Sequence, residues 1–294
     1  MKLLGQRLIY MNTPEHRPRR AAYALPTLFT AGNVYLGFYA MLEIFHGAME
    51  TITAVSGANR HFEIAAIAIA AAVFLDGLDG RIARMTNTVS EFGREMDSLA
   101  DCITFGIAPA VLAFAWGVEF VEPPQRFINP EQLRNAGYFF AFLYLMCGAA
   151  RLARFNIQKN PVPKNPGRPD RKYFVGMPIP SAALCVAAVV YFLSGAPVQS
   201  WMMSLAWLAL LALLSFLMVS TWRYPSFKDL SLTRGRPPLT FILVGSLIYL
   251  IWNFSRPVLL ALAATYVLSG IVIRVGGIVR RLFRPAAAAP RQAI

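Results

Sequence analysis

The chain has 294 residues, of which 56% are hydrophobic, and carries a formal net charge of +13 at pH 7. This composition is too apolar for an ordinary soluble domain and is typical of a polytopic membrane protein. The basic residues stand at the ends of apolar segments rather than in one patch. The charge therefore favours loops facing anionic lipid and does not indicate a nucleic-acid partner.

Eight apolar segments follow one another along the chain, and several approach the ~20 residues that a helix needs to cross a bilayer. They span about 25–46, 62–84, 95–118, 136–157, 178–194, 201–221, 238–254 and 257–274. We expect an all-α fold, a polytopic membrane helix bundle. The flanking parts are a basic arm (1–24), a basic loop (222–237) and a basic Ala/Pro-rich tail (275–294).

Lysine and arginine are concentrated in alternate inter-span segments. They are frequent before the first span and after the second, fourth, sixth and eighth, and sparse in the segments between. Cytoplasmic loops carry this excess of positive charge. The pattern predicts that both termini and the loop between the second and third spans face the cytoplasm, with the protein integral to a membrane, expected to be the bacterial cytoplasmic membrane.

Four aspartates interrupt the apolar pattern around the second and third spans. Asp76 and Asp79 are three residues apart, and Asp97 and Asp101 are four apart, so each pair lies on one face of its helix. Two facing helices would bring four carboxylates into one pocket, where they would repel one another strongly. Mg²⁺ or Mn²⁺, which prefer oxygen ligands, would relieve that repulsion.

The spacing of these residues, Asp-x2-Asp-Gly-x2-Ala-Arg-x8-Gly-x3-Asp-x3-Asp, resembles the signature of the CDP-alcohol phosphatidyltransferases. All eight positions match: Asp76, Asp79, Gly80, Ala83, Arg84, Gly93, Asp97 and Asp101. The resemblance covers about residues 25–221. It implies a six-span catalytic core, to which 238–274 would add two transmembrane helices that the signature does not explain.

The resemblance also implies roles for these positions. Two divalent cations, Mg²⁺ or Mn²⁺, would be held by Asp76, Asp79 and Asp97, and Asp101 would be the general base and could also contact a metal. The residues expected to bind CDP-diacylglycerol are Gly80, Ala83, Arg84, Gly93 and Asn33, although Asn33 could equally bond across helices. The family further implies a homodimer.

Other segments resemble the phosphatidylserine synthase branch of the family. They include Gly176-Met-Pro-Ile-Pro180 and Arg151-Leu-Ala-Arg154-Phe-Asn156. This branch implies transfer of the phosphatidyl group of CDP-diacylglycerol to L-serine, which yields phosphatidylserine and CMP. Arg151 or Arg154 would bind the serine carboxylate, because a guanidinium grips a carboxylate with two donors; the alternative is that they only anchor the span.

Two rival functions remain open. The same chemistry could use another alcohol, such as glycerol 3-phosphate, inositol phosphate or choline. A cation transporter would instead spread its carboxylates along several spans. His46 and His61 flank the loop between the first two spans, far from the aspartates, and we expect no catalytic role for them.

Overall fold

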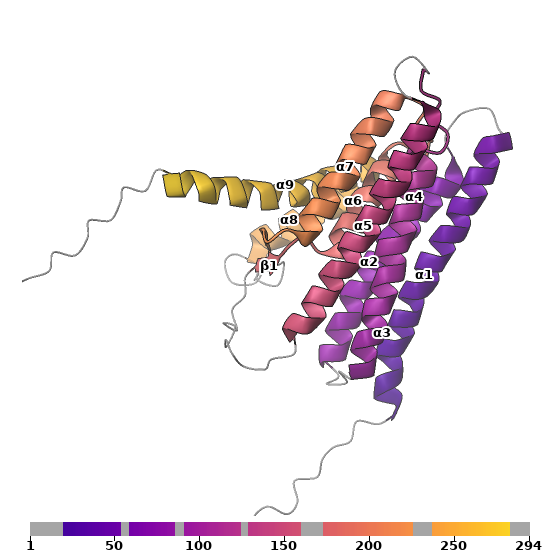
Figure 1. Cartoon of the computed structure of the whole chain (residues 1–294). Coiled ribbons are helices and arrows are strands. Elements are labelled where there is room, and N and C mark those ends of the chain that lie inside the picture. The colour runs from indigo at the N-terminus through magenta and orange to yellow at the C-terminus, as the bar shows by residue number, and fades with distance from the viewer. Residues whose placement is uncertain are drawn as a thin grey trace, which may run out of the picture.

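A computed structural model of the chain is a bundle of long helices (Figure 1). It describes the backbone of residues 20–53, 59–85, 91–124, 129–159, 173–225 and 237–282. Within these ranges the side chains are described except those of residues 20–27, 79–80, 83–85, 158–159, 173–174, 223, 225, 237–241, 243, 277–278 and 280–282. Most of the predicted basic arm, most of the predicted loop 222–237 and most of the predicted tail lie outside the described residues.

The order of elements follows the predicted spans closely. The helices are α1 (Arg20–Thr53), α2 (Arg60–Met85), α3 (Glu91–Asp101), η1 (Cys102–Ile107), α4 (Ala108–Gly117), α5 (Pro130–Lys159), α6 (Ile179–Phe192), α7 (Trp201–Val219), α8 (Pro237–Asn253) and α9 (Ser255–Leu282). Proline stands in the first turn of α6 and begins α5 and α8, where its missing N–H costs nothing.

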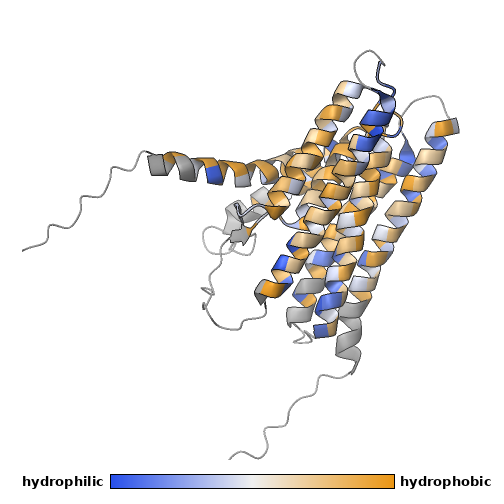
Figure 2. Ribbon diagram, viewed as in Figure 1, coloured by the Kyte–Doolittle hydropathy of each residue, from blue (hydrophilic) through white to orange (hydrophobic). Residues whose placement is uncertain are grey.

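Each predicted apolar segment is helical, which confirms the all-α membrane bundle. Among the described residues, six stretches are long and apolar enough to cross a bilayer. They are Leu28–Thr53, Arg60–Leu78, Glu91–Gly117, Pro130–Ile157, Trp201–Val219 and Ser255–Gly276. Ile179–Phe192 is a shorter apolar helix, and the described part of α8, Val244–Asn253, is apolar as well. Apolar residues cover the bundle along its length, and polar residues gather toward its ends (Figure 2).

Small side chains let the helices approach closely. The buried face of α2 carries Ala65, Ala68 and Ala72, and α1 packs along it over a long contact. Elsewhere Gly117 of α4 faces Trp207 of α7, whose indole nitrogen donates a hydrogen bond of 2.9 Å to a carbonyl of α4. The bundle is therefore held by close backbone packing as well as by large apolar side chains.

Two short strands, which we did not expect, lie at the entry to α6 and the exit from α7. They are β1 (Tyr173–Val175) and β2 (Arg223–Pro225), and they pair antiparallel with Phe174 opposite Tyr224. Gly176 follows β1 with φ +78°, and a Cβ there would lie 2.6 Å from the Met218 carbonyl oxygen. Only glycine fits this turn without strain, so Gly176 makes the entry into α6.

The two C-terminal helices, α8 and α9, are joined by a turn at Phe254. The first half of α9 is fixed to the bundle. The Tyr191 and Ser255 hydroxyls lie 2.8 Å apart, and Arg256 donates to Glu63 at 2.7 Å. The later part of α9 projects away from the bundle in Figure 1. It stays helical to Leu282, past the predicted end at 274, because no proline occurs in this stretch before 285.

Candidate active site

Three of the four predicted metal ligands meet between α2 and α3. Asp76 lies near the end of α2, and Asp97 and Asp101 lie one turn apart on α3. One carboxylate oxygen of each falls within 4.8 Å of the other two. Asp76 and Asp97 are partly exposed, whereas Asp101 is buried. Three carboxylates this close would repel one another, and an all-oxygen donor set fits a hard divalent cation such as Mg²⁺ or Mn²⁺.

The remaining signature positions are placed only in part. The backbone of α2 is helical through Asp79, which follows Asp76 by three residues and so shares its helix face. The side chains of Asp79, Gly80, Ala83 and Arg84 lie outside the described residues. Gly93 is exposed in the first turn of α3. The roles predicted for these positions therefore stay predictions.

A π-helix begins directly after the last aspartate. The segment η1 joins α3 and α4 into one continuous span, and its first residue follows Asp101. π-helical turns are rare and are frequent at functional sites. Nothing in the residue pattern indicated this turn, because periodicity over six residues does not separate π from α geometry.

The π-helix packs against α1 through a glycine. Thr104, fully buried, donates a hydrogen bond of 3.0 Å to the carbonyl oxygen of Asn33. A Cβ on Gly37 would lie 2.5 Å from Thr104 Oγ1 and 2.9 Å from its Cα, so only glycine permits this approach. Asn33 is itself buried, and its side-chain oxygen has no hydrogen-bond partner among the described residues. Its neighbour across the helix contact, Thr104, follows Asp101 by three residues, so a ligand at the aspartates could use this unpaired oxygen.

The two candidate acceptor arginines lie in different surroundings. Arg151 is 8% exposed, its charge interacts with the carboxylates of Asp101 and Asp76, and its guanidinium lies 5.6 Å from the ring centre of Phe155. Arg154 donates to the carbonyl oxygens of Val219 (3.0 Å) and Val175 (3.2 Å).

Arg154 therefore ties α5 to the end of α7 and to β1. Arg151 is the arginine that the fold brings toward the aspartates, although the sequence predicted the same role for both residues.

A second contact fixes α5 against α3. Asn156 donates from its side-chain amide to the hydroxyl of Ser98 at 2.9 Å, and Ser98 donates to the carbonyl oxygen of Arg94 at 3.0 Å. Ser98 immediately follows Asp97. This chain of bonds orients the face of α3 that carries the aspartates, a role that the sequence did not reveal.

The C-terminal helix also reaches toward the site. Tyr266 of α9 interacts with the Ser181 hydroxyl and with the charge of Arg151, and its ring centre lies 5.6 Å from that of Tyr224. Tyr224 is fully buried against Gly270, and burial raises its pKa to about 12. The sequence did not predict this contact, because the signature ends more than 160 residues before Tyr266.

Comparisons with other proteins agree with this geometry. The sequence profile of CDP-alcohol phosphatidyltransferase matches residues 23–212. The chain belongs to the CDP-alcohol phosphatidyltransferase family.

Three relatives carry related names. A CDP-diacylglycerol–serine O-phosphatidyltransferase of Helicobacter pylori (strain ATCC 700392 / 26695) is 37% identical over 273 residues, 90% of this chain and 94% of that protein. A Bacillus subtilis (strain 168) protein of the same name is 33% identical over 208 residues, 69% of this chain and 91% of its own. An archaetidylserine synthase of Methanothermobacter thermautotrophicus is 31% identical over 204 residues, 69% of this chain and 70% of its own.

Proposed function

We propose that this membrane enzyme transfers the phosphatidyl group of CDP-diacylglycerol to the hydroxyl of L-serine and releases CMP. The observation that carries the proposal is the meeting of Asp76, Asp97 and Asp101 within 4.8 Å, at positions of the family signature. The relatives at 37% and 33% identity are named for this reaction, and the archaeal relative's name also contains serine. Family membership removes the reason to consider a cation transporter.

Asp76, Asp79 and Asp97 would hold two divalent cations, Mg²⁺ or Mn²⁺. Bound cations supply charge stabilisation for the phosphoryl oxygens and the leaving group. Asp101 would accept the proton of the serine hydroxyl as that oxygen attacks the phosphorus. Its burial beside Arg151 suits a base whose proton must not be lost to bulk water. Asn33, Gly80, Ala83, Arg84 and Gly93 would line the CDP-diacylglycerol site.

The acceptor carboxylate would bind Arg151. Among the described side chains, Arg151 is the one lysine or arginine that is buried. A single buried guanidinium suits one carboxylate, whereas a phosphorylated acceptor such as glycerol 3-phosphate would favour several basic groups. Choline has no anionic group for Arg151 to bind. The described part of the site thus supports serine over the other alcohols.

The decisive experiment measures CMP release from CDP-diacylglycerol by the purified protein. Serine, glycerol 3-phosphate, inositol phosphate and choline are offered separately at equal concentration, with Mg²⁺ or Mn²⁺. We expect serine to give the fastest release and phosphatidylserine to be the product. A preference for another alcohol would overturn the acceptor assignment and leave the transferase chemistry intact; no CMP release with any alcohol would overturn both.

We infer that the site faces the cytoplasm and that the protein is a homodimer. The orientation rests on the excess of lysine and arginine in the segments that follow α2, α5 and α7. Single cysteines introduced at 86–90 or 160–172 should be labelled only from the cytoplasmic side, and one at 125–128 only from the opposite side. Labelling of 86–90 from outside would reverse the orientation.

A further inference from the structure

A second group of potential metal ligands lies at the other end of α1 and α2. It consists of Glu43 and His46 on α1 and His61 on α2, and one ligand atom of each lies within 4.8 Å of the other two. Glu43 and His46 are three residues apart, so both point from the same helix face toward His61. The same Glu-x-x-His spacing on helices supplies metal ligands in other helix bundles.

The carboxylate of Glu43 is buried inside a membrane-spanning segment. Glu43 is 8% exposed and lies within the span Leu28–Thr53. Its ion-pair partner among the described residues is the imidazole of His61, whose Nδ1 lies 2.7 Å from Glu43 Oε2. Tyr39, one turn earlier on α1, adds a hydrogen bond from its hydroxyl. A buried carboxylate needs compensating partners, and among the described residues these are the His61 imidazole and the Tyr39 hydroxyl.

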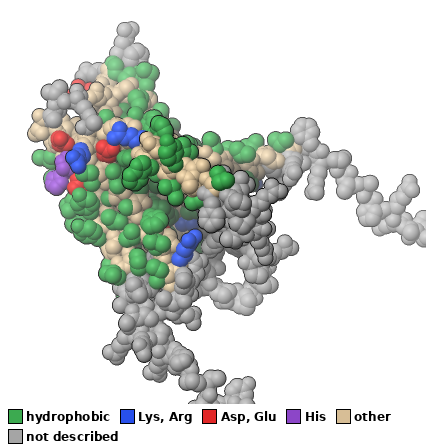
Figure 3. Space-filling view, turned by 180° about the vertical axis from the view of Figure 1, so that it is seen from behind, with side chains coloured by type: hydrophobic (Ala, Val, Ile, Leu, Met, Phe, Trp, Pro, Cys, Tyr) green, Lys and Arg blue, Asp and Glu red, His purple; other side chains and the backbone are tan. Residues whose placement is uncertain are grey.

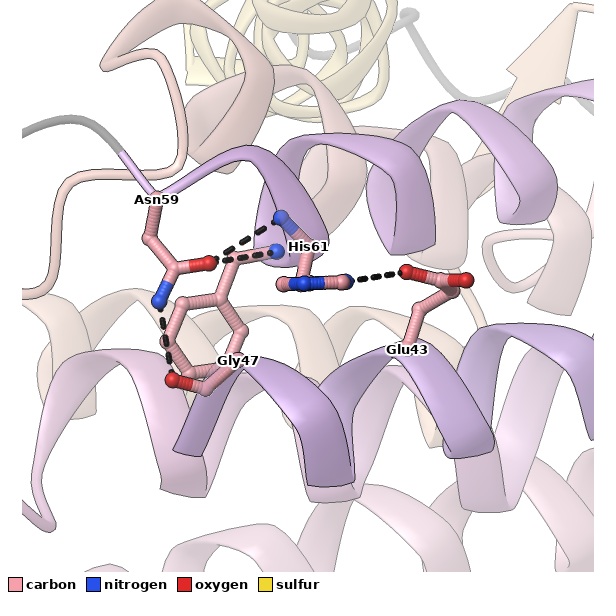
Figure 4. Close-up of polar contacts among 5 residues, drawn as sticks. Glu43, Gly47, Asn59 and His61 are labelled. Atoms are coloured by element: carbon pink, nitrogen blue, oxygen red, sulfur yellow. Dashed lines mark hydrogen bonds and ion pairs between the residues drawn. The ribbon is translucent and has the colours of Figure 1, made fainter. Parts of the chain in front are cut away.

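Asn59 holds the histidine in place before any ligand binds (Figure 4). Its side-chain oxygen accepts hydrogen bonds from the backbone N–H groups of His61 and Phe62, at 3.0 and 3.3 Å, and so caps the start of α2. Its side-chain nitrogen donates to the carbonyl oxygen of Gly47 on α1 at 2.8 Å. One residue thus fixes the register between the two helices that carry the ligands.

We propose that Glu43, His46 and His61 form a binding site for a divalent transition-metal ion of the zinc class. Imidazole nitrogen and one carboxylate are a ligand set that zinc accepts, with a fourth position left for water. Ligand atoms about 2.0–2.1 Å from a tetrahedral ion lie roughly 3.3 Å apart. The 2.7 Å contact between His61 and Glu43 would therefore open by about 0.6 Å, which a small side-chain movement supplies.

This site is separate from the aspartates in both place and chemistry. His61 and Asp76 are 15 residues apart on α2, which corresponds to about 22 Å along the helix. The aspartates offer only oxygen and favour Mg²⁺ or Mn²⁺, whereas two imidazoles favour a softer ion. Histidine is exposed at this end of the bundle, beside acidic and basic side chains (Figure 3), so an ion can enter from solvent. Bound there, the ion would cross-link α1 and α2 near their connection.

The test titrates zinc into the full chain, purified in detergent and stripped of metal with a chelator. Excess Mg²⁺ is present throughout to occupy the carboxylate site. We expect one Zn²⁺ per chain by calorimetry and by metal analysis after desalting. Co²⁺ in place of zinc should give the visible absorption of a four- or five-coordinate ion. His46→Gln should weaken zinc binding by at least about 100-fold. Loss of a residue that only hydrogen-bonds to a metal ligand costs up to about that factor, and loss of a direct ligand should cost more.

Matched variants separate this site from other sources of binding. His16→Gln changes the chain's third histidine and should bind zinc like the wild type. Asp97→Asn should also keep the zinc, because that residue belongs to the other site. Because His46 is exposed, its replacement should leave the fold intact even if Glu43→Gln does not. The proposal is overturned if the wild type binds no zinc under excess Mg²⁺, or if His46→Gln and His61→Gln bind it as the wild type does.

Discussion

Replacing Gly37 with alanine tests whether the contact between α1 and the π-helix positions the catalytic base. The new Cβ would lie 2.5 Å from Thr104 Oγ1 and 2.9 Å from Thr104 Cα. Ordinary contact begins near 3.4 Å, so α1 and η1 must separate by about 0.5–0.9 Å. The second of these contacts is to backbone, which a side-chain rotation cannot relieve.

Gly37→Ala should lower both the stability of the fold and the rate of catalysis. Overpacking of this kind costs about 1–3 kcal/mol, which exceeds the roughly 0.5–1 kcal/mol that alanine contributes over glycine within a helix. A displacement near 1 Å in a catalytic site can lower the rate by about 100-fold. Asp101 immediately precedes η1, so we expect kcat/KM for CMP release to fall by roughly that factor while the protein still folds.

The assay compares CMP release at equal amounts of purified variant, with thermal unfolding and gel filtration as measures of folding. Gly245→Ala is the matched control, because nothing lies within 4 Å of the Cβ that it adds to α8. It should keep full activity. If Gly37→Ala retains activity within a factor of two of the wild type, the contact does not position Asp101 and the reasoning fails.

Four further predictions concern the aspartates and the two arginines. Chelation should abolish CMP release, Mg²⁺ or Mn²⁺ should restore it, and Asp76→Asn should abolish it without unfolding; an active Asp76→Asn would remove that residue from the metal site. Asp101→Asn should slow the chemical step by about 10²–10⁴-fold while sparing CDP-diacylglycerol binding, and equal loss of binding would make it chiefly a ligand. Arg151→Lys should raise the KM for serine roughly tenfold or more, through loss of a charge-assisted bond of about 1.5–3 kcal/mol. Arg154→Lys should instead lower thermal stability, because the Arg154 guanidinium donates hydrogen bonds to backbone carbonyl oxygens. If Arg151→Lys leaves the serine kinetics unchanged, both arginines only anchor the span.

The sequence predicted the parts of the fold that depend on local pattern. Long apolar segments end at charges or prolines, so each helix could be predicted, although the ends of α1, α5 and α9 extend past the predicted segments. Asp76, Asp97 and Asp101 could be grouped because helical spacing puts each pair on one face, and the fold then needs only to bring α2 and α3 together.

The parts that the sequence did not predict depend on contacts between distant segments. Arg151 and Arg154 lie on one helix and differ only in what surrounds them, so their separate roles required the packing of α7 and β1. His46 and His61 looked like isolated residues beside a loop, because their approach depends on the cap that Asn59 makes between α1 and α2. Strands of three residues leave too short a pattern to recognise.

The π-helix after Asp101 has a consequence for how this span tolerates change in length. A π-turn holds one residue more than an α-turn, so η1 acts as an insertion stored within the third span. Deleting one residue within η1, such as Gly106, would remove the bulge and return the span to regular α geometry while leaving α3 and α4 in the same phase. Asp97 and Asp101 would still face Asp76. A one-residue deletion in the regular helix on either side would instead rotate the two parts of the span by about 100° relative to each other, so η1 is where this span best tolerates a change in length.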